Sequence, residues 1–119
     1  MGGEVMNTKP NVIEIESFLK EAKSLIRKGK YDFVPRRKNM QSLAKYGLSI
    51  IDAKEEIGDL KIENYYKGPK EDFDRTRTGA IWEFKKQINS NLFYVKLKVT
   101  EINGERVLKC IGFHEDEFI

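Results

Sequence analysis

The chain has 119 residues, of which 39% are hydrophobic and 34% charged, a composition typical of one folded domain rather than of a disordered chain. Lysine and arginine number 22 against 19 acidic residues, and a net charge of +3 does not by itself indicate nucleic-acid binding. One cysteine and one histidine exclude an internal disulfide and a Cys/His metal cluster. No apolar run approaches the roughly 18 residues of a membrane helix, and the start lacks a signal peptide's apolar core. We therefore expect a cytoplasmic protein with no membrane segment, metal or cofactor.

The first half of the chain carries helical patterns. Residues 1–10 are predicted to be a polar leader, and residues 11–119 a single domain. Asn11 and Glu14 have the spacing of a capping box, and an apolar stripe at helical spacing follows them. The predicted helices are Val12–Lys28, Arg36–Tyr46 with Met40, Leu43 and Ala44 facing inward, and about Ile50–Ile57, and a short β-prone segment, Tyr31–Val34, separates the first two.

The second half changes to the period of strands. Leu60–Tyr66 fits either a strand or a helical turn, and Gly68–Gly79 is predicted to be a long irregular segment, which in a small domain is often functional. Three strands are predicted, at Ala80–Ile88, Leu92–Thr100 and Glu105–His114. The expected fold is α+β, with N-terminal helices packed on a C-terminal antiparallel sheet of three or four strands.

The predicted sheet has two unlike faces, because side chains alternate along a strand. In the middle strand the odd-numbered residues from Phe93 to Val99 are apolar and face the core, whereas Tyr94, Lys96 and Lys98 face the other way. A turn over Ser90-Asn91 would pair Asn89 with Leu92. That register places Trp82 and Phe84 in the core, Glu83 opposite Lys98, and Lys85 and Gln87 beside Glu83 on the polar face.

Two turns are possible before the last strand. A two-residue Asn103-Gly104 turn would turn Ile111 and Phe113 toward Tyr94. A three-residue loop, Ile102 to Gly104, would pair Glu101 with Glu105 and is preferred because it buries more apolar surface. This loop places Val107, Ile111 and Phe113 in the core, and Cys110, Gly112 and His114 on the face of Tyr94. It also leaves Lys109 on the core side, where the residue must lie near an edge or extend its ammonium to solvent.

The polar face combines a carboxylate, an imidazole, a phenol and several cations, which is the set that RNA cleavage by the 2′-hydroxyl needs. A base takes the 2′-hydroxyl proton, an acid protonates the leaving 5′-oxygen, and cations stabilise the phosphorane. Glu83 is the expected base, or the group that orients it, and His114, whose unperturbed pKa is about 6.5, is the expected acid. The plainer alternatives are a salt-bridged Glu83, which would be a weaker base, and a surface His114 that begins an acidic tail.

Several cations and one phenol would bind the substrate. Tyr94 would stack on a base or donate to the phosphate, and the alternative is an ordinary half-exposed sheet tyrosine. Arg36, Arg37 and Lys38 are expected to begin a helix surface and are not assigned to catalysis. The expected RNA-binding residues are Lys96, Lys98, Lys85, Gln87, Arg75 and Arg77, and each of the cations could equally be solvated surface charge.

Segments over roughly residues 18–116 resemble the MqsR-type toxins, a RelE-like group of mRNA interferases. The most specific pieces are Ile81-Trp82, the run from Tyr94 to Val99, and Phe113-His114-Glu115. Weaker ones are Phe18–Gly29, similar to the family's first helix, Lys45–Leu48, similar to the joint between its helices, and Asn64–Lys67, similar to its D-F-Y-K segment.

The resemblance implies a RelE-like fold and cleavage of mRNA, free or bound to the ribosome. It also implies neutralisation by a cognate antitoxin protein that binds DNA. The family's active-site lysine falls on Lys67 and its catalytic tyrosine on Tyr94, whereas Glu83 and His114 stand where the family has glutamine and lysine. Two alternatives stay open: a non-catalytic RNA-binding or regulatory module, and a protein-interaction domain that uses the same basic face.

Overall fold

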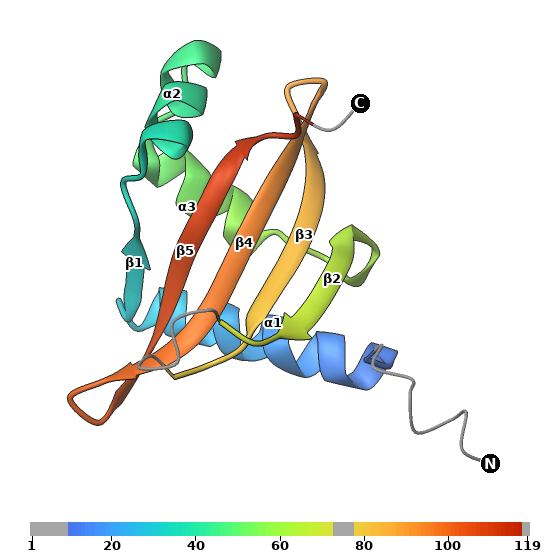
Figure 1. Cartoon of the computed structure of the whole chain (residues 1–119), viewed down its shortest axis with the longest axis vertical. Coiled ribbons are helices and arrows are strands. Elements are labelled where there is room, and N and C mark those ends of the chain that lie inside the picture. The colour runs from blue at the N-terminus through green and yellow to red at the C-terminus, as the bar shows by residue number, and fades with distance from the viewer. Residues whose placement is uncertain (1–9, 73–77, 118–119) are drawn as a thin grey trace.

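The structure, a computed structural model, describes residues 10–72 and 78–117 (Figure 1). The polar leader predicted for residues 1–10 therefore lies almost wholly outside the described residues, as do Arg75 and Arg77. Among the described residues, no helix has the length and apolar character needed to cross a bilayer.

The three predicted helices are confirmed to within one residue at each end. They are α1 (Val12–Arg27), α2 (Arg37–Tyr46) and α3 (Ile50–Gly58). The Asn11–Glu14 capping box forms, with each side chain 2.9 Å from the other residue's backbone nitrogen. On α2, Leu43 is buried as predicted, but Met40 and Ala44 are exposed, and Asn39 and Ser42 are buried instead. The inner face of α2 is thus partly polar, because it meets strand backbone rather than only apolar side chains.

Within the described part of the chain five strands form the sheet, so the expected count of three or four is wrong, while the α+β class is confirmed. The strands are β1 (Tyr31–Phe33), β2 (Tyr65–Lys70), β3 (Ile81–Ile88), β4 (Asn91–Ile102) and β5 (Glu105–Glu115), in the order β1-β5-β4-β3-β2. The sheet is mixed, because β1 runs parallel to β5 while the other neighbours are antiparallel. The segment Leu60–Tyr66 divides into a 3₁₀ turn, Ile62–Asn64 (η2), and the start of β2.

The β3–β4 hairpin keeps the predicted faces but not the predicted register. Its turn is Asn89-Ser90, both with positive φ (50° and 68°), so Ile88 pairs with Asn91. A shift of two residues leaves every side chain on its face, because the period of a strand is two. Trp82 and Phe84 are therefore in the core as expected, but Glu83 lies opposite Lys96, and the expected pairing with Lys98 is wrong.

The β4–β5 turn is the two-residue Asn103-Gly104 turn, so the preferred three-residue loop is wrong. Both residues have positive φ (52° and 80°), as the two-residue turn that matches strand twist requires. Ile102 pairs with Glu105, and in this half of β5 Leu108 and Cys110 are fully buried. Cys110 thus belongs to the core, and Val107 and Lys109 lie on the opposite face, contrary to the expectation for all three.

A β-bulge at Ile111 then exchanges the faces for the rest of β5. Leu97 pairs with Cys110, but the next pair is Lys96 with Gly112, so Ile111 is the extra residue. Beyond the bulge Phe113 is fully buried and His114 lies on the same face as Tyr94, as predicted, but His114 pairs directly with Tyr94, where the predicted register paired Tyr94 with Gly112. The predicted core position of Ile111 is wrong, since it lines a cavity on the other face.

Helices cover only one face of the sheet (Figure 1). Helix α1 crosses behind β3, β4 and β5, and Phe18 stacks on Trp82 with 4.7 Å between ring centroids. The opposite face, here called the open face, carries Glu83, Tyr94, Lys96, Lys98 and His114. The open face therefore carries the predicted polar site residues of β3, β4 and β5.

Candidate functional site

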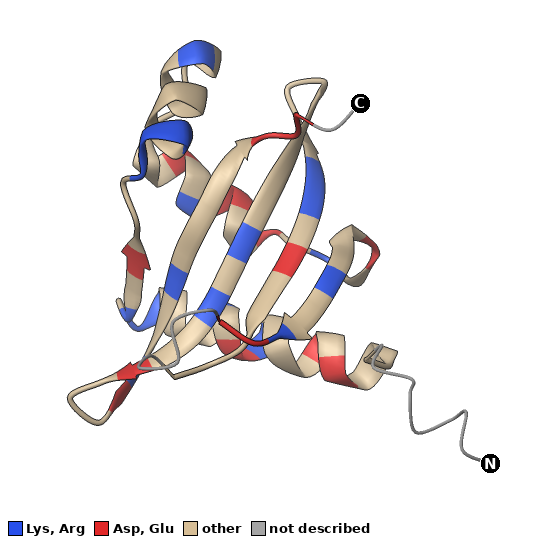
Figure 2. Ribbon diagram, viewed as in Figure 1, with Lys and Arg blue, Asp and Glu red and all other residues tan. Residues whose placement is uncertain are grey.

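The open face is basic over all four of its long strands. Figure 2 shows basic bands across β2, β3, β4 and β5, with an acidic band in the middle of β3 and acidic residues at both ends of β5. The lysines on this face are Lys67 and Lys70 on β2, Lys85 on β3, Lys96 and Lys98 on β4, and Lys109 on β5, as the strand register places them. Such a surface attracts polyanions, and the attraction weakens as salt increases.

The N-terminus of α2 adds three more cations to the open face. Arg36, Arg37 and Lys38 line a cavity of 470 Å³, here called the basic cavity, together with Asn39, Tyr94, Lys96, Ile111, Gly112 and His114. These three residues were not among the predicted site residues, because only the packing of α2 against β5 brings them there. Lys96, Arg36 and Arg37 make no ion pair with the residues that the structure describes, so their charges are available to an anion.

Gly112 lets the side chains of Lys96 and Tyr94 pack directly against the β5 backbone in the basic cavity. A Cβ at this position would lie 3.1 Å from the Cβ of Lys96 and 3.6 Å from Cε1 of Tyr94. The first distance is shorter than ordinary van der Waals contact, so the side chains of Lys96 and Tyr94 already occupy the space over Gly112. A larger residue at position 112 would displace Lys96 or Tyr94 in the wall of the basic cavity.

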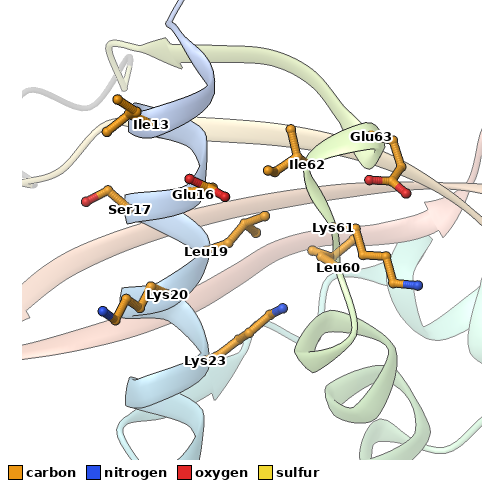
Figure 3. Close-up of a pocket in the computed structure, with 10 residues that line it drawn as sticks. All are labelled: Ile13, Glu16, Ser17, Leu19, Lys20, Lys23, Leu60, Lys61, Ile62 and Glu63. Carbon is orange, nitrogen blue, oxygen red and sulfur yellow. The ribbon is translucent and has the colours of Figure 1, made fainter.

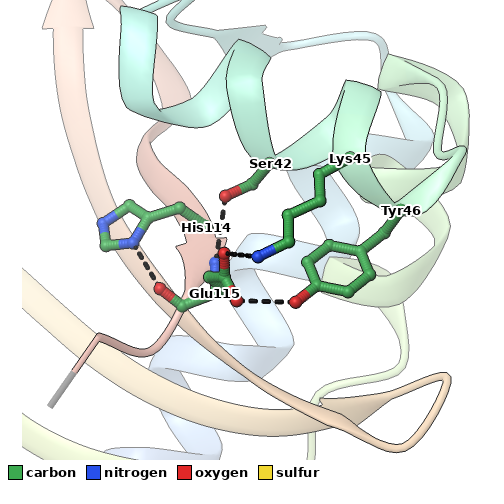
Figure 4. Close-up of polar contacts among 5 residues, drawn as sticks. All are labelled: Ser42, Lys45, Tyr46, His114 and Glu115. Carbon is green, nitrogen blue, oxygen red and sulfur yellow. Dashed lines mark hydrogen bonds and ion pairs between the residues drawn. The ribbon is translucent and has the colours of Figure 1, made fainter.

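His114 is held at the edge of the basic cavity by two contacts. Its ring stacks on Tyr94, with 5.3 Å between centroids and 25° between planes. Its Nδ1 lies 2.9 Å from the carbonyl oxygen of Glu115 (Figure 4). A carbonyl only accepts, so Nδ1 carries the proton, and in the neutral ring Nε2 keeps its lone pair for proton transfer.

The end of β5 is tied to α2 by the residue after His114. The Glu115 carboxylate accepts hydrogen bonds from Lys45 Nζ (2.7 Å) and from the Tyr46 hydroxyl (2.6 Å), and these bonds lower its pKa. The Glu115 backbone N–H donates to Ser42 Oγ at 3.2 Å (Figure 4). These contacts fix the strand end, and with it the carbonyl that orients the imidazole.

Asn39, on the buried side of α2, satisfies the backbone groups that the bulge leaves without strand partners. Its Nδ2 donates to the carbonyl oxygens of Ile111 (3.0 Å) and Val34 (2.9 Å), and its Oδ1 accepts from the Phe113 N–H at 2.9 Å. The side chain is 1% exposed. Because the bulge decides which face His114 occupies, Asn39 is a positioning residue for the site, and sequence analysis did not find it.

Glu83 lies on β3 opposite Lys96, on the same face as Tyr94, and is 3% exposed. It forms an ion pair with Lys70, and the Tyr94 hydroxyl donates a hydrogen bond to it. Burial raises the pKa of Glu83, but the hydrogen bonds from Lys70 and Tyr94 and the charges of Lys70 and Lys96 outweigh burial and lower it. Glu83 is therefore the salt-bridged carboxylate that sequence analysis gave as the plainer alternative, although its partner is Lys70 rather than Lys98.

Tyr94 remains a phenol at neutral pH. Burial, followed by the hydrogen bond to Glu83 and the charge of Glu83, raises its pKa well above the ordinary value. Glu83, Tyr94 and His114 thus form a continuous row, in which Glu83 accepts from Tyr94 and Tyr94 stacks on His114. The structure brings together these three predicted site residues.

The other predicted residues lie around this row. Lys67 is exposed on β2, opposite Glu83, with its ammonium 5.1 Å from the Tyr66 ring centroid. Lys85 is held by Asp116 at 2.9 Å and lies over the Tyr66 ring, while Gln87 is exposed near the end of β3. Lys98 is 2% exposed and pairs with Asp72 at 2.5 Å. These positions put Lys67 and Lys85 beside the row rather than in it.

A cavity of 720 Å³ lies elsewhere, between α1 and the segment around η2 (Figure 3). Glu16, Leu19 and Lys23 face it from α1, and Leu60 and Ile62 face it from the other side. Its lining contains neither imidazole nor phenol. The basic cavity differs from it, since Tyr94, His114 and the cations Arg36, Arg37 and Lys96 meet there.

No group of three or more His, Cys, Asp or Glu side chains suited to a metal ion occurs within residues 10–72 and 78–117. No family model and no curated protein matches this chain, so its function is inferred from the geometry and chemistry of the site.

Proposed function

We propose that this protein is a metal-independent endoribonuclease that cleaves RNA by attack of the 2′-hydroxyl on the adjacent phosphate. The observation that carries the proposal is the row of Glu83, Tyr94 and His114 at the edge of a cavity lined by unpaired cations. The nucleophile comes from the substrate, so the protein needs to supply proton transfer and charge stabilisation. DNA lacks the 2′-hydroxyl and would bind without being cut.

Each member of the site has a role in this reaction. Lys96, Arg36 and Arg37 hold the scissile phosphate and stabilise the charge that develops on it. Tyr94 accepts the proton of the 2′-hydroxyl while its own proton passes to Glu83, because Glu83 is too buried to touch RNA directly. His114, protonated on Nε2, gives its proton to the leaving 5′-oxygen. The products are a 2′,3′-cyclic phosphate and a free 5′-hydroxyl.

The proposal also covers the fold family and the biological role of the protein. The protein is a RelE-like toxin that is similar to the MqsR-type interferases, acts on mRNA, and is neutralised by a cognate antitoxin. The basic open face supports the choice of a polyanionic substrate, since nine of its arginines and lysines meet around the sheet and the start of α2.

The test compares purified protein on RNA and on DNA of the same sequence, in EDTA. RNA should be cut to cyclic phosphate ends and DNA should stay intact. His114→Ala should cut at least about a hundredfold more slowly while melting as a folded protein. Lys86→Met, which removes an ion-paired lysine outside the basic cavity, is the control and should cut normally.

The relay is tested by combining variants. Tyr94→Phe and Glu83→Gln should each slow cleavage, and the double variant should be hardly slower than either alone, because both remove one proton path. RNA that binds but stays uncut by the wild-type protein would overturn the proposal in favour of an RNA-binding module. A His114→Ala variant that cuts at the wild-type rate would overturn the assignment of the acid.

A further inference from the structure

A second cavity, of 750 Å³, opens on the same face beside the basic cavity. The two cavities share Arg36, Lys96 and Ile111, which therefore stand between them. In the proposed reaction Lys96 holds the scissile phosphate, so a chain bound across that phosphate would place one nucleoside in each cavity. The second cavity belongs to the volume range of small-molecule sites and is large enough for a nucleoside.

The walls of the second cavity suit a flat heteroaromatic ring. Apolar side chains from three strands and from the segment after β1 line it: Ile81 on β3, Ile102 on β4, the bulge residue Ile111 on β5, and Val34 after β1. Thr78 and Thr100 add hydroxyls, which are hydrogen-bonded to each other at 2.8 Å. Apolar walls with a few convergent polar groups are the usual composition of a ligand pocket.

Lys98 lies in the lining of this cavity although it is 2% exposed. An ammonium carries three N–H donors, and the partner of Lys98 in the described residues is Asp72 alone, at 2.5 Å. A buried ion pair adds little to stability, because the cost of desolvating two charges offsets their attraction. Two of the three Lys98 donors thus have no partner within residues 10–72 and 78–117, and the residue lines the second cavity.

We propose, on the basis of the proposed cleavage site, that the second cavity binds the base of the neighbouring nucleotide and that Lys98 selects a base with a ring carbonyl. Lys98 donates to the ring carbonyl oxygen that uracil, cytosine and guanine each carry, and Thr100 lies in the same cavity lining. Adenine has no carbonyl and presents an amino group to the ammonium, so it is disfavoured. Lys98 is thus a specificity-determining residue, and Lys96 between the two cavities holds the phosphate.

The test uses uncleavable dinucleotides, so that binding is measured without the reaction. Methyl NMR signals of Ile81, Ile102 and Ile111 are followed while 2′-deoxyuridine or 2′-deoxyadenosine dinucleotide is added. We expect the uridine compound to shift these signals and to bind about tenfold more tightly than the adenosine compound. Lys98→Met should remove the difference, whereas Lys86→Met, also an ion-paired lysine of low exposure but outside the cavity, should keep it.

A second variant tests the subsite with the Lys98–Asp72 pair intact, so that its result does not depend on whether Lys98→Met folds. Ile102 is 43% exposed at the rim, so Ile102→Trp can fill the cavity while leaving that pair in place, and it should abolish the shift of Ile81. Equal affinities for both dinucleotides, or methyl signals of Ile81 and Ile102 that do not move, would overturn the second subsite. If RNA is cut but Ile81 does not respond, only the subsite fails. If Ile81 responds but RNA is never cut, only the nuclease fails.

Discussion

Replacing Asn39 with alanine should cost about 3 kcal/mol of unfolding free energy and should also displace His114. The side chain makes three hydrogen bonds to backbone groups, of 2.9, 3.0 and 2.9 Å, and is almost fully buried. Each such bond contributes about 1 kcal/mol net, and an alanine would remove the Asn39 partner from the Ile111 carbonyl and the Phe113 N–H, whereas the Val34 carbonyl would still accept from the Arg36 N–H. With a urea dependence of about 1.5 kcal/mol per molar, the unfolding midpoint should fall by about 2 M.

The control for this prediction is Ser42→Ala, on the same buried side of α2. Ser42 accepts one hydrogen bond, from the Glu115 N–H, so its loss should cost about 1 kcal/mol. In folded Asn39→Ala protein, the ring-to-ring NMR contacts between Tyr94 and His114 should weaken, because residues beyond the bulge are no longer held. A loss below about 1 kcal/mol, or unchanged ring contacts, would refute the view that Asn39 holds the bulge.

The remaining predictions use single substitutions or one reagent. Glu83 has a folded-state pKa below its ordinary value of 4.5, so it stabilises the fold above that pH and loses this effect as the pH falls; Glu83→Gln should flatten the fall of unfolding free energy between about pH 5 and pH 3 in urea melts. Burial raises the pKa of Cys110 far above the ordinary value, so a thiol reagent at neutral pH should modify it only as fast as the protein unfolds, and rapid labelling of native protein would contradict its burial. Gly104 has a φ of 80°, so Gly104→Val should cost about 1–2 kcal/mol in thermal melts, and an unchanged melt would show that the turn has another conformation.

The helices and the inner three strands could be predicted because their signals are local. Capping boxes at Asn11 and Ser49 mark where two helices start, and alternating apolar residues assign the faces of β3 and β4 correctly. The edge strands could not be predicted as securely. β1 has three residues, and β2 contains Gly68 and Pro69, so each depends on its neighbour in the sheet rather than on its own pattern.

The register of β5 shows why part of the site escaped prediction. Each turn model satisfied half of the strand: the two-residue turn suits Leu108 and Cys110, and the three-residue loop suits Phe113 and His114. A tight turn followed by one extra residue satisfies both halves, and the awkward position of Lys109 was the signal for it. The partner that holds the extra residue, Asn39, is 72 positions away in the chain, and no strand pattern contains that information.

The contacts that place His114 also have a consequence for the order of folding. They join residues 72, 73 and 74 positions apart, whereas the β4–β5 hairpin closes through a two-residue turn. Closing a long loop costs more chain entropy than closing a hairpin, so the hairpin is expected to form early and α2 to dock late. Detachment of α2 alone would then remove the contacts that orient the His114 imidazole, while the sheet persists. Amide hydrogen exchange at Phe113 and Glu115 should therefore be faster than at the centre of β4.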